Sequence, residues 1–161
     1  MSAVFRPADE GDLEHVKWAL YTAVTWDPEG RVPPFEVTID HPQLALYHRD
    51  WMRPGDVGVV AEREGTVVGV AFCRLFTADD HGHGYVDDET PEIAVAVAEG
   101  HRGDGLGRRL LDELAKAARE AGFVRLSLSV DTQNPARRLY TRLGYRTISD
   151  DDSGVRMVLD L

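Results

Sequence analysis

Residues 97–109 read Val97-Ala98-Glu99-Gly100-His101-Arg102-Gly103-Asp104-Gly105-Leu106-Gly107-Arg108-Arg109. An apolar, strand-like run leads into this stretch, and a long amphipathic helix pattern begins at its end. Glycines at a strand-to-helix turn remove the Cβ atoms that would hold a ligand away from the backbone. The helix start that follows offers unpaired N–H groups and about half a positive charge. The stretch therefore predicts an anion cradle suited to a pyrophosphate.

Two familiar phosphate-binding loops do not match this stretch. A P-loop requires Gly-Lys-Ser/Thr where this chain has Gly107-Arg108-Arg109, and the dinucleotide fingerprint requires glycine where the chain has Arg108. The pattern that matches is Arg-x-x-Gly-x-Gly, from Arg102 to Gly107. Taken alone, it is equally compatible with a glycine-rich turn that only joins a strand to a helix.

A second motif lies downstream. Residues 134–145 read Asn134-Pro135-Ala136-Arg137-Arg138-Leu139-Tyr140-Thr141-Arg142-Leu143-Gly144-Tyr145. An Asn thus precedes a short helix that carries a Tyr and ends at Gly-Tyr. In order and spacing the two motifs resemble the coenzyme A loop and the second signature of the GNAT superfamily of N-acetyltransferases. The resemblance covers about residues 90–148, and only the order of elements supports it upstream.

Length and composition predict a single domain over residues 1–161. The longest apolar runs fall well short of the ~20 residues of a membrane span, and the first residues lack the apolar core of a signal peptide. The one cysteine, Cys73, excludes an internal disulfide and reads as a buried, inert thiol. Together these features favour a cytoplasmic protein without membrane contacts.

The pattern of apolar residues predicts an α+β fold. Strands are expected over about 4–7, 57–62, 66–72, 92–97, 125–130, 145–149 and 155–160, and helices over about 9–20, 42–52, 105–121 and 135–143. The strand–helix–strand segment 92–130 requires a crossover, so its two strands are parallel. We therefore expect a mixed, mostly antiparallel sheet with one central parallel pair, flanked by helices. The family resemblance implies that this pair splays apart to admit the pantetheine arm.

The resemblance also implies a binding site for acetyl-coenzyme A, the co-substrate, without a metal ion. Arg102 is expected near phosphate, although a plain surface charge is the alternative. Asn134 is expected to bind pantetheine or only to cap the following helix, and two strand valines to bind through their backbone. The expected contacts are Val95, Val97, Arg102, Gly103, Asp104, Gly105, Leu106, Gly107, Arg108 and Asn134.

Two side chains are expected to carry the chemistry. By resemblance, Tyr140 protonates or hydrogen-bonds the departing thiolate, and the alternative is a tyrosine that only packs its helix on the sheet. Glu92 occupies the position where many relatives carry a catalytic glutamate. Because a carboxylate is a weak base toward an ammonium group, proton removal through water is more plausible than direct abstraction. A solvated charge at a strand end is the alternative for Glu92.

The predicted reaction is direct attack of a primary amine on the thioester of acetyl-coenzyme A. Residues 1–99 hold 7 Lys and Arg against 19 Asp and Glu, a net charge of −12, whereas residues 100–161 carry +2. This acidity favours a small cationic amine as acceptor and disfavours nucleic acid. Peptide N-termini, a role for the acidity in solubility alone, and a catalytically silent acyl-coenzyme A-binding module remain alternatives. A homodimer is also left open.

The segment 77–90 is read as a polar loop that carries His81 and His83 among several acids. Two histidines two residues apart on a loop are weak evidence for a metal site. The loop is instead expected to be solvated, with a share in acceptor recognition as the alternative. Trp26 lies in a second irregular segment that could border the acceptor site.

Overall fold

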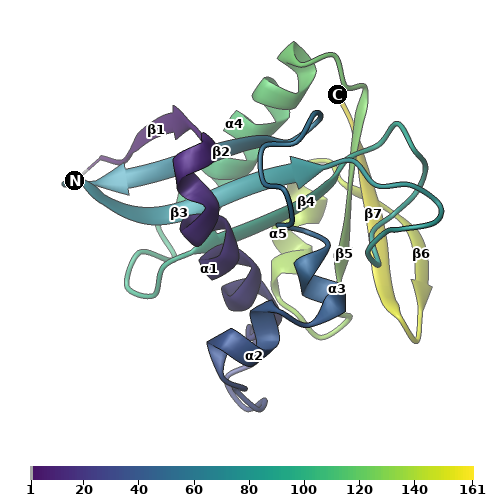
Figure 1. Ribbon diagram of the computed structural model, residues 1–161, viewed down its shortest axis with the longest axis horizontal. Helices are drawn as coiled ribbons and strands as arrows, with labels where there is room; N and C mark the ends of the chain where they lie inside the picture. Colours follow the sequence, from purple (N-terminus) through teal and green to yellow (C-terminus); the bar gives the residue numbers. More distant parts are fainter. Residues whose placement is uncertain (1) are drawn as a thin grey trace.

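The computed structural model describes residues 2–161 and contains one seven-stranded sheet (Figure 1). The strand order is β1-β2-β3-β4-β5-β7-β6, and every neighbouring pair is antiparallel except β4 and β5. The expected sheet, with its central parallel pair, is therefore confirmed. The strands are β1 (Val4–Pro7), β2 (Val57–Arg63), β3 (Thr66–Arg74), β4 (Glu92–Val97), β5 (Arg125–Val130), β6 (Arg146–Asp151) and β7 (Gly154–Asp160).

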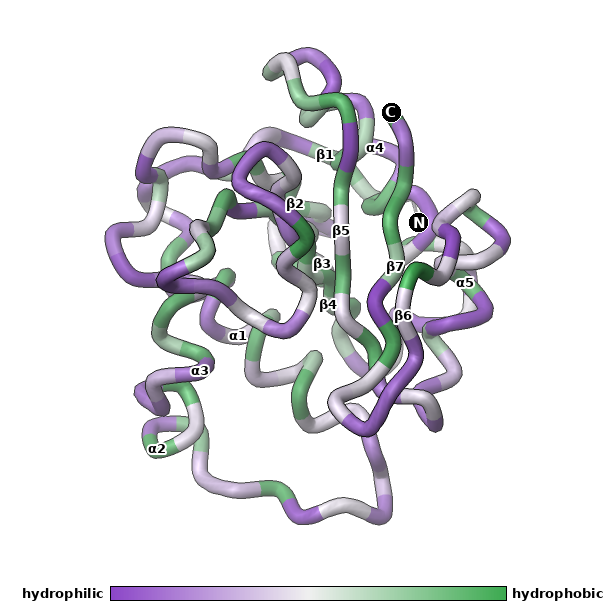
Figure 2. Tube along the Cα trace, turned by 90° about the vertical axis from the view of Figure 1, so that its right-hand side faces the viewer, coloured by the Kyte–Doolittle hydropathy of each residue, from purple (hydrophilic) through white to green (hydrophobic). Residues whose placement is uncertain are grey.

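Helices cover both faces of the sheet. Helix α4 (Leu106–Glu120) packs on β2, β3 and β4 from one side, and α1 (Leu13–Val24) packs on β3 and β4 from the other (Figure 1). The remaining helical segments are η1 (Glu10–Asp12), α2 (Phe35–Ile39), α3 (Pro42–Ala45) and α5 (Ala136–Arg142). Much of β5 and β7 is hydrophobic, while the outer strand β6 is largely hydrophilic (Figure 2). Among the described residues, no helix combines the length and apolar character of a membrane span.

Helix α4 forms where the apolar period predicts it. Its buried side chains recur at helical spacing and pack against the sheet: Leu106, Leu110, Leu111, Leu114 and Ala118. The helix ends in a Schellman arrangement, with Gly122 at φ +97° and the Phe123 amide donating to Ala118 O at 3.0 Å. Gly122 therefore ends the helix. The buried side chains and this C-terminal arrangement fix α4 against the sheet, where it also contacts β4.

The parallel pair β4–β5 separates after one residue pair. Glu92 pairs with Ser127, and no further β4–β5 pair is formed among the described residues. The Ala98 amide, just after β4, donates to Val68 O of β3 at 2.8 Å. This bond fixes which residues of β4 turn their backbone N–H and C=O groups toward β3. The backbone groups of Val95 and Val97 therefore face away from β3, toward the opening between β4 and β5. The splay that the family resemblance implied is present.

The expected helix over residues 42–52 is wrong beyond Ala45. The carbonyls of Leu46 and Arg49, which a longer helix would use internally, instead accept hydrogen bonds from the buried Arg74 guanidinium at 3.1 and 2.6 Å. Asp50 and Met52 then adopt positive φ values of 54° and 70°. A tertiary contact thus overrides the local helical pattern. Two smaller differences are that α1 extends to Val24 and that the expected loop before residue 42 contains α2.

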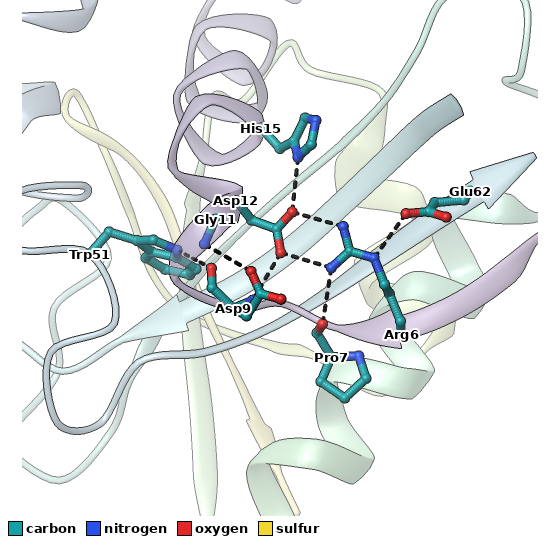
Figure 3. A network of polar contacts seen from close by, with 8 residues as sticks. All are labelled: Arg6, Pro7, Asp9, Gly11, Asp12, His15, Trp51 and Glu62. Carbon is teal, nitrogen blue, oxygen red and sulfur yellow. Dashed lines mark hydrogen bonds and ion pairs between the residues drawn. The ribbon is translucent and has the colours of Figure 1, made fainter. Parts of the chain in front are cut away.

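A polar network joins β1 to the start of α1 (Figure 3). Asp9 accepts from the Gly11 amide at 2.8 Å, and Asp12 reaches back to the Asp9 amide at 2.9 Å. Asp9 and Asp12 therefore form a capping box at the start of η1. The Arg6 guanidinium donates two hydrogen bonds of 2.8 Å to the buried Asp12 carboxylate. Hydrogen bonding to Arg6 holds the pKa of Asp12 well below its usual range.

Asp12→Asn is expected to lower the free energy of unfolding by about 2 kcal/mol at neutral pH, because a charged hydrogen bond is lost. The folded-state pKa of Asp12 is depressed, so its contribution is present above the ordinary aspartate pKa and is lost as pH falls. The difference between variant and wild type should therefore shrink below about pH 4. Urea titrations at pH 7 and pH 3 measure it, and a difference that does not change with pH would contradict the assignment.

Candidate active site

A cavity of about 520 Å³ opens where β4 and β5 separate. Its walls come from α1, the α2–α3 region, the loop before β4, the two splayed strands and α5. The lining residues that matter below are Trp26, His41, Tyr47, His83, Glu92, Val95, Ser129, Asp131, Asn134 and Tyr140. The cavity thus brings together both expected catalytic residues, Glu92 and Tyr140, with Val95 and Asn134 of the expected coenzyme site. Trp26 borders the same space.

The edge of β4 supplies the polar groups on the coenzyme side of the cavity. Backbone groups of Val95 and Val97 face the opening, where β5 does not pair with them. The carbonyl of Val97 already accepts a hydrogen bond from Arg102 Nε at 2.8 Å. Arg102 is exposed, but its guanidinium therefore folds back on the strand, and one of its donors is engaged there.

The loop between β4 and α4 has the conformation of an anion cradle. Gly103 and Gly105 both adopt φ +87°, the left-handed region that favours glycine. Arg109 donates the first helical bond, to Gly105 O at 3.1 Å, so the amides of Leu106, Gly107 and Arg108 lack acceptors within the helix. A Cβ at either Gly103 or Gly105 would meet no protein atom within 4 Å. The space beside this backbone is therefore open to an anionic ligand.

The side chain of Asp104 does not take part in an anion-binding site. Its carboxylate forms an ion pair with Arg63 at 2.7 Å, and that pairing lowers the pKa of Asp104. Arg63, at the end of β2, also contacts His101 Nδ1 at 3.0 Å. These contacts tie the loop to β2. The backbone of the loop, rather than the Asp104 side chain, fits a pyrophosphate.

Gly105→Ala is expected to weaken acetyl-coenzyme A binding by about tenfold to a hundredfold, because the new methyl group stands where phosphate oxygens approach the amides. Gly122→Ala is the matched control. Gly122 has a similar φ of +97° and is equally open, so both variants carry the same backbone strain. Calorimetric titration measures the two dissociation constants. Equal affinity in both variants would show that the loop does not hold the phosphates.

Glu92 is buried, contrary to its alternative as a solvated charge. The residue is 4% exposed, one carboxyl oxygen accepts a hydrogen bond from the Tyr47 hydroxyl, and Oε1 has no partner among the described residues. Burial raises the pKa of Glu92 to about 7, although the hydrogen bond from Tyr47 opposes this shift. A carboxyl group with this pKa can accept a proton near neutral pH.

The loop before β4 covers Glu92 closely. A Cβ at Gly84 would lie 2.7 Å from Glu92 Cδ and 2.8 Å from its Cγ. A Cβ at Gly82 would fall on the Tyr47 hydroxyl. The two glycines therefore allow the loop to pack over the carboxyl, while the exposed His83 lines the cavity between them. Among the described residues, no three or more His, Cys, Asp or Glu side chains gather as a metal site would require.

Tyr140 and Asn134 border the other part of the cavity, at α5. The Tyr140 ring packs edge-on against Tyr145 at 5.8 Å, and burial of the hydroxyl raises the pKa of Tyr140 to about 12. The phenol is therefore protonated throughout the neutral range. Asn134 Oδ1 accepts from the Ala136 amide at 2.9 Å, which is the capping role left open by the sequence. Its amide nitrogen is not used in that bond.

Sequence reasoning did not find Tyr47, Gly82 or Gly84. Tyr47 lies 45 residues from Glu92 and belongs to the segment expected to be helical. The alternation His81-Gly82-His83-Gly84 predicts only a solvated polar loop, with a share in acceptor recognition as the alternative. The close packing that requires glycine at those positions depends on tertiary structure. Cys73 is fully buried, as expected, and burial raises the pKa of its thiol to about 12.

Comparisons with known proteins agree with this geometry. The model of the acetyltransferase (GNAT) family matches residues 19–145. Streptothricin acetyltransferase of Streptomyces lavendulae is 46% identical over 153 residues, which covers 87% of this chain and 78% of that protein. The L-amino acid N-acyltransferase MnaT of Escherichia coli is 30% identical over 128 residues, covering 78% of this chain. The matched region spans about two thirds, 66%, of the length of MnaT.

A solved structure that contains acetyl-coenzyme A has a similar fold. The acetyltransferase yncA of Salmonella typhimurium, determined with acetyl-coenzyme A, has a TM-score of 0.72 and 26% identity, over 100% of this chain and 95% of that one. The glycine loop, the open edge of β4 and the cavity fit such a molecule here. The chain belongs to the GNAT family of acetyl-coenzyme A-dependent acetyltransferases.

Proposed function

We propose that this enzyme acetylates the primary amine of a small, cationic molecule. The observation that carries the proposal is the single cavity that unites the open edge of β4 with Glu92 and Tyr140. Bound acetyl-coenzyme A supplies an activated acetyl thioester. The residues of the chain then have three tasks, which are to bind the donor, to remove a proton from the acceptor and to stabilise the departing thiolate.

Donor binding is assigned to backbone groups. The amides at the start of α4, together with Gly103 and Gly105, hold the pyrophosphate. The backbone of Val95 and Val97 binds the pantetheine arm along the open edge of β4, and the unused amide nitrogen of Asn134 lies across the opening. The Arg102 guanidinium, which stays anchored on Val97 O, adds positive charge to the loop.

Proton removal is assigned to Glu92. An amine is mostly protonated at neutral pH and must lose a proton before it can attack. The unpartnered Oε1 atom is the acceptor, and a water molecule carries the proton across any remaining gap. Its raised pKa, about 7, makes this carboxyl a better base than a solvated glutamate. Burial therefore supplies the basicity that the residue type alone lacks.

Thiolate stabilisation is assigned to Tyr140, which lines the same cavity as Glu92. Its hydroxyl remains protonated in the neutral range, so it can donate a hydrogen bond to developing negative charge. Because the pKa of Tyr140 exceeds that of an ordinary thiol, a hydrogen bond is favoured over complete proton transfer.

The charge of the cavity supports a cationic acceptor. Its lining includes the carboxyl groups of Glu92 and Asp131, and the described lining contains neither lysine nor arginine. Relatives named for amine acceptors, namely amino acids and streptothricin, agree with a small molecule rather than a nucleic acid. A cytoplasmic location and a homodimer stay predictions from the sequence.

A panel of acceptors tests the proposal, with thiol release from acetyl-coenzyme A as the readout. Small diamines and basic amino acids should react faster than neutral amines, amino acids without a basic side chain, or peptides that present only an N-terminus. The Michaelis constant of the best acceptor should rise several-fold between about 0.02 and 0.5 M salt, because screening weakens attraction by the acidic walls.

These measurements must be made at saturating acetyl-coenzyme A, since donor binding also responds to salt. A neutral or anionic best acceptor, or a Michaelis constant that ignores salt, would assign the acidity to solubility alone. Peptides as the best acceptors would favour modification of protein N-termini. No thiol release with any amine would favour a silent acyl-coenzyme A-binding module.

A further inference from the structure

Arg74 and Asp56 form an ion pair whose side chains are completely buried. Arg74, the last residue of β3, donates from Nε to Asp56 Oδ1 at 2.9 Å and from Nη2 to Oδ2 at 2.7 Å. Removing two charges from water is costly, and a buried pair seldom adds net stability over apolar residues of similar size. The pair therefore needs another explanation than stability.

Both members of the pair also hold the chain between α3 and β2. Arg74 Nη1 donates to the carbonyls of Leu46 and Arg49, and Asp56 Oδ2 accepts from the Met52 amide at 2.9 Å. This segment contains no regular helix after α3 and includes two positive φ values outside glycine. Short-range backbone bonds, such as Arg49 N to Ala45 O and Asp56 N to Arg53 O, shape its turns, and the ion pair fastens these turns to β3.

The segment carries Tyr47, which contacts Glu92. The carbonyl of Leu46, the residue before Tyr47, accepts a hydrogen bond from Arg74. The Tyr47 ring packs edge-on against Phe76, with 5.1 Å between the ring centroids, and the Tyr47 hydroxyl donates to Glu92. Tyr47 is 8% exposed. In the sheet, Arg74 and Glu92 are also cross-strand partners in β3 and β4. Arg74 is thus linked to Glu92 in two ways, through the segment that carries Tyr47 and through the pairing of β3 with β4.

We infer that the Arg74–Asp56 pair positions the Glu92 carboxyl for proton transfer, acting through the Tyr47 hydroxyl. This inference rests on the proposed function of Glu92. Arg74 and Asp56 lie outside the cavity lining and act only through the segment that they hold. They are positioning residues, as is Tyr47, whose hydroxyl fixes one carboxyl oxygen and leaves Oε1 as the proton acceptor.

The hydrogen bond from Tyr47 also affects the charge state of Glu92. Donation to the carboxylate lowers the pKa of Glu92 against the effect of burial. The other titratable or charged groups nearby are His41 beside α3, His83 in the covering loop, Arg74 in β3 and Asp131 after β5. None of these four side chains has a hydrogen bond to the Glu92 carboxyl among the described residues, so Tyr47 is the group to test.

The test is the acid limb of the profile of kcat/KM against pH. Tyr47→Phe removes the donated hydrogen bond, so the limb should move up by about one pH unit. Replacing both charges, as Arg74→Met with Asp56→Leu, avoids leaving one buried charge unpaired and should give the same shift. Combining all three substitutions should produce no further shift, because all three act through the same hydrogen bond from Tyr47 to Glu92.

Two further variants test the inference even if the double variant of Arg74 and Asp56 does not fold. Gly82→Ala, on the covering loop, places a methyl group on the Tyr47 hydroxyl and should shift the limb in the same direction. Arg74→Lys keeps the charge but cannot hold the carboxylate and both carbonyls with one ammonium group, so it should give a smaller shift. Asp12→Asn is the control, because it breaks a partly buried ion pair elsewhere in the fold without touching Tyr47.

The control should lose free energy of unfolding while its acid limb stays in place. If the Arg74 and Asp56 variants lose activity or stability with an unmoved limb, the pair is structural and the inference is overturned. If Tyr47→Phe alone shifts the limb, Tyr47 acts without the pair and the inference again fails. An acid limb that survives Glu92→Gln would instead refute the proposed role of Glu92.

Discussion

Glu92→Gln should lower kcat/KM by about 10²–10⁴-fold, the usual range for loss of a general base. The amide has the size of the carboxyl group and can still accept the Tyr47 hydrogen bond, but it cannot take a proton from the amine. The pKa of Glu92 is raised by burial to about 7, and the carboxylate is the active form. Wild-type activity should therefore rise with pH through about 7, and the variant should lose this rise.

The variant should also stay folded. Burial disfavours the charged form of Glu92, so ionisation of this group costs folding free energy at neutral pH, and the neutral amide avoids that cost. His83→Ala is the companion variant, because His83 lines the same cavity and an imidazole nitrogen can accept a proton. Loss of the acid limb in His83→Ala, with Glu92→Gln retaining it, would transfer the role of base to His83.

Tyr140→Phe should lower kcat by about 10²-fold or more while the dissociation constant of acetyl-coenzyme A changes little. Only the hydroxyl is lost, and the ring contact with Tyr145 at 5.8 Å remains. The effect should be greatest on the step in which the thiolate departs. Single-turnover kinetics with a saturating acceptor measure that step directly.

A matched control for Tyr140 is Tyr145→Phe. The Tyr145 hydroxyl is buried without a partner among the described residues, and Tyr145 does not line the cavity. Removing it should leave kcat near the wild-type value. Equal turnover in wild type and Tyr140→Phe would reduce Tyr140 to a packing residue.

The sequence predicts best what short stretches determine. The glycine-rich turn before α4 is predicted from its residues, and the structure shows Gly103 and Gly105 in the left-handed region there. The parallel β4–β5 pair follows from the length of the connection, because only a crossover can join such strands. These features depend on neighbouring residues, and so they can be derived without knowledge of tertiary contacts.

The surroundings of Glu92 could not be derived in this way. Its burial depends on the loop that packs over it and on Tyr47, which arrives from a distant segment. That segment looks helical in sequence, and Arg74 captures the carbonyls that a helix would need. Arg102 gives a similar lesson, because the sequence suggests a phosphate ligand and does not show that Nε is bound to Val97 O.

The single pair that joins β4 to β5 has a thermodynamic consequence for the whole enzyme. Strands β1–β4 and strands β5–β7 form two blocks, and among the described residues only Glu92 and Ser127 pair between them, with the Ser127 amide donating to Pro91 O at 2.9 Å. A donor molecule in the opening adds its binding free energy to that of folding, about 2.7 kcal/mol at a hundred times its dissociation constant. Acetyl-coenzyme A should therefore also raise the free energy of unfolding, and thermal melts with and without the donor would measure this stabilisation.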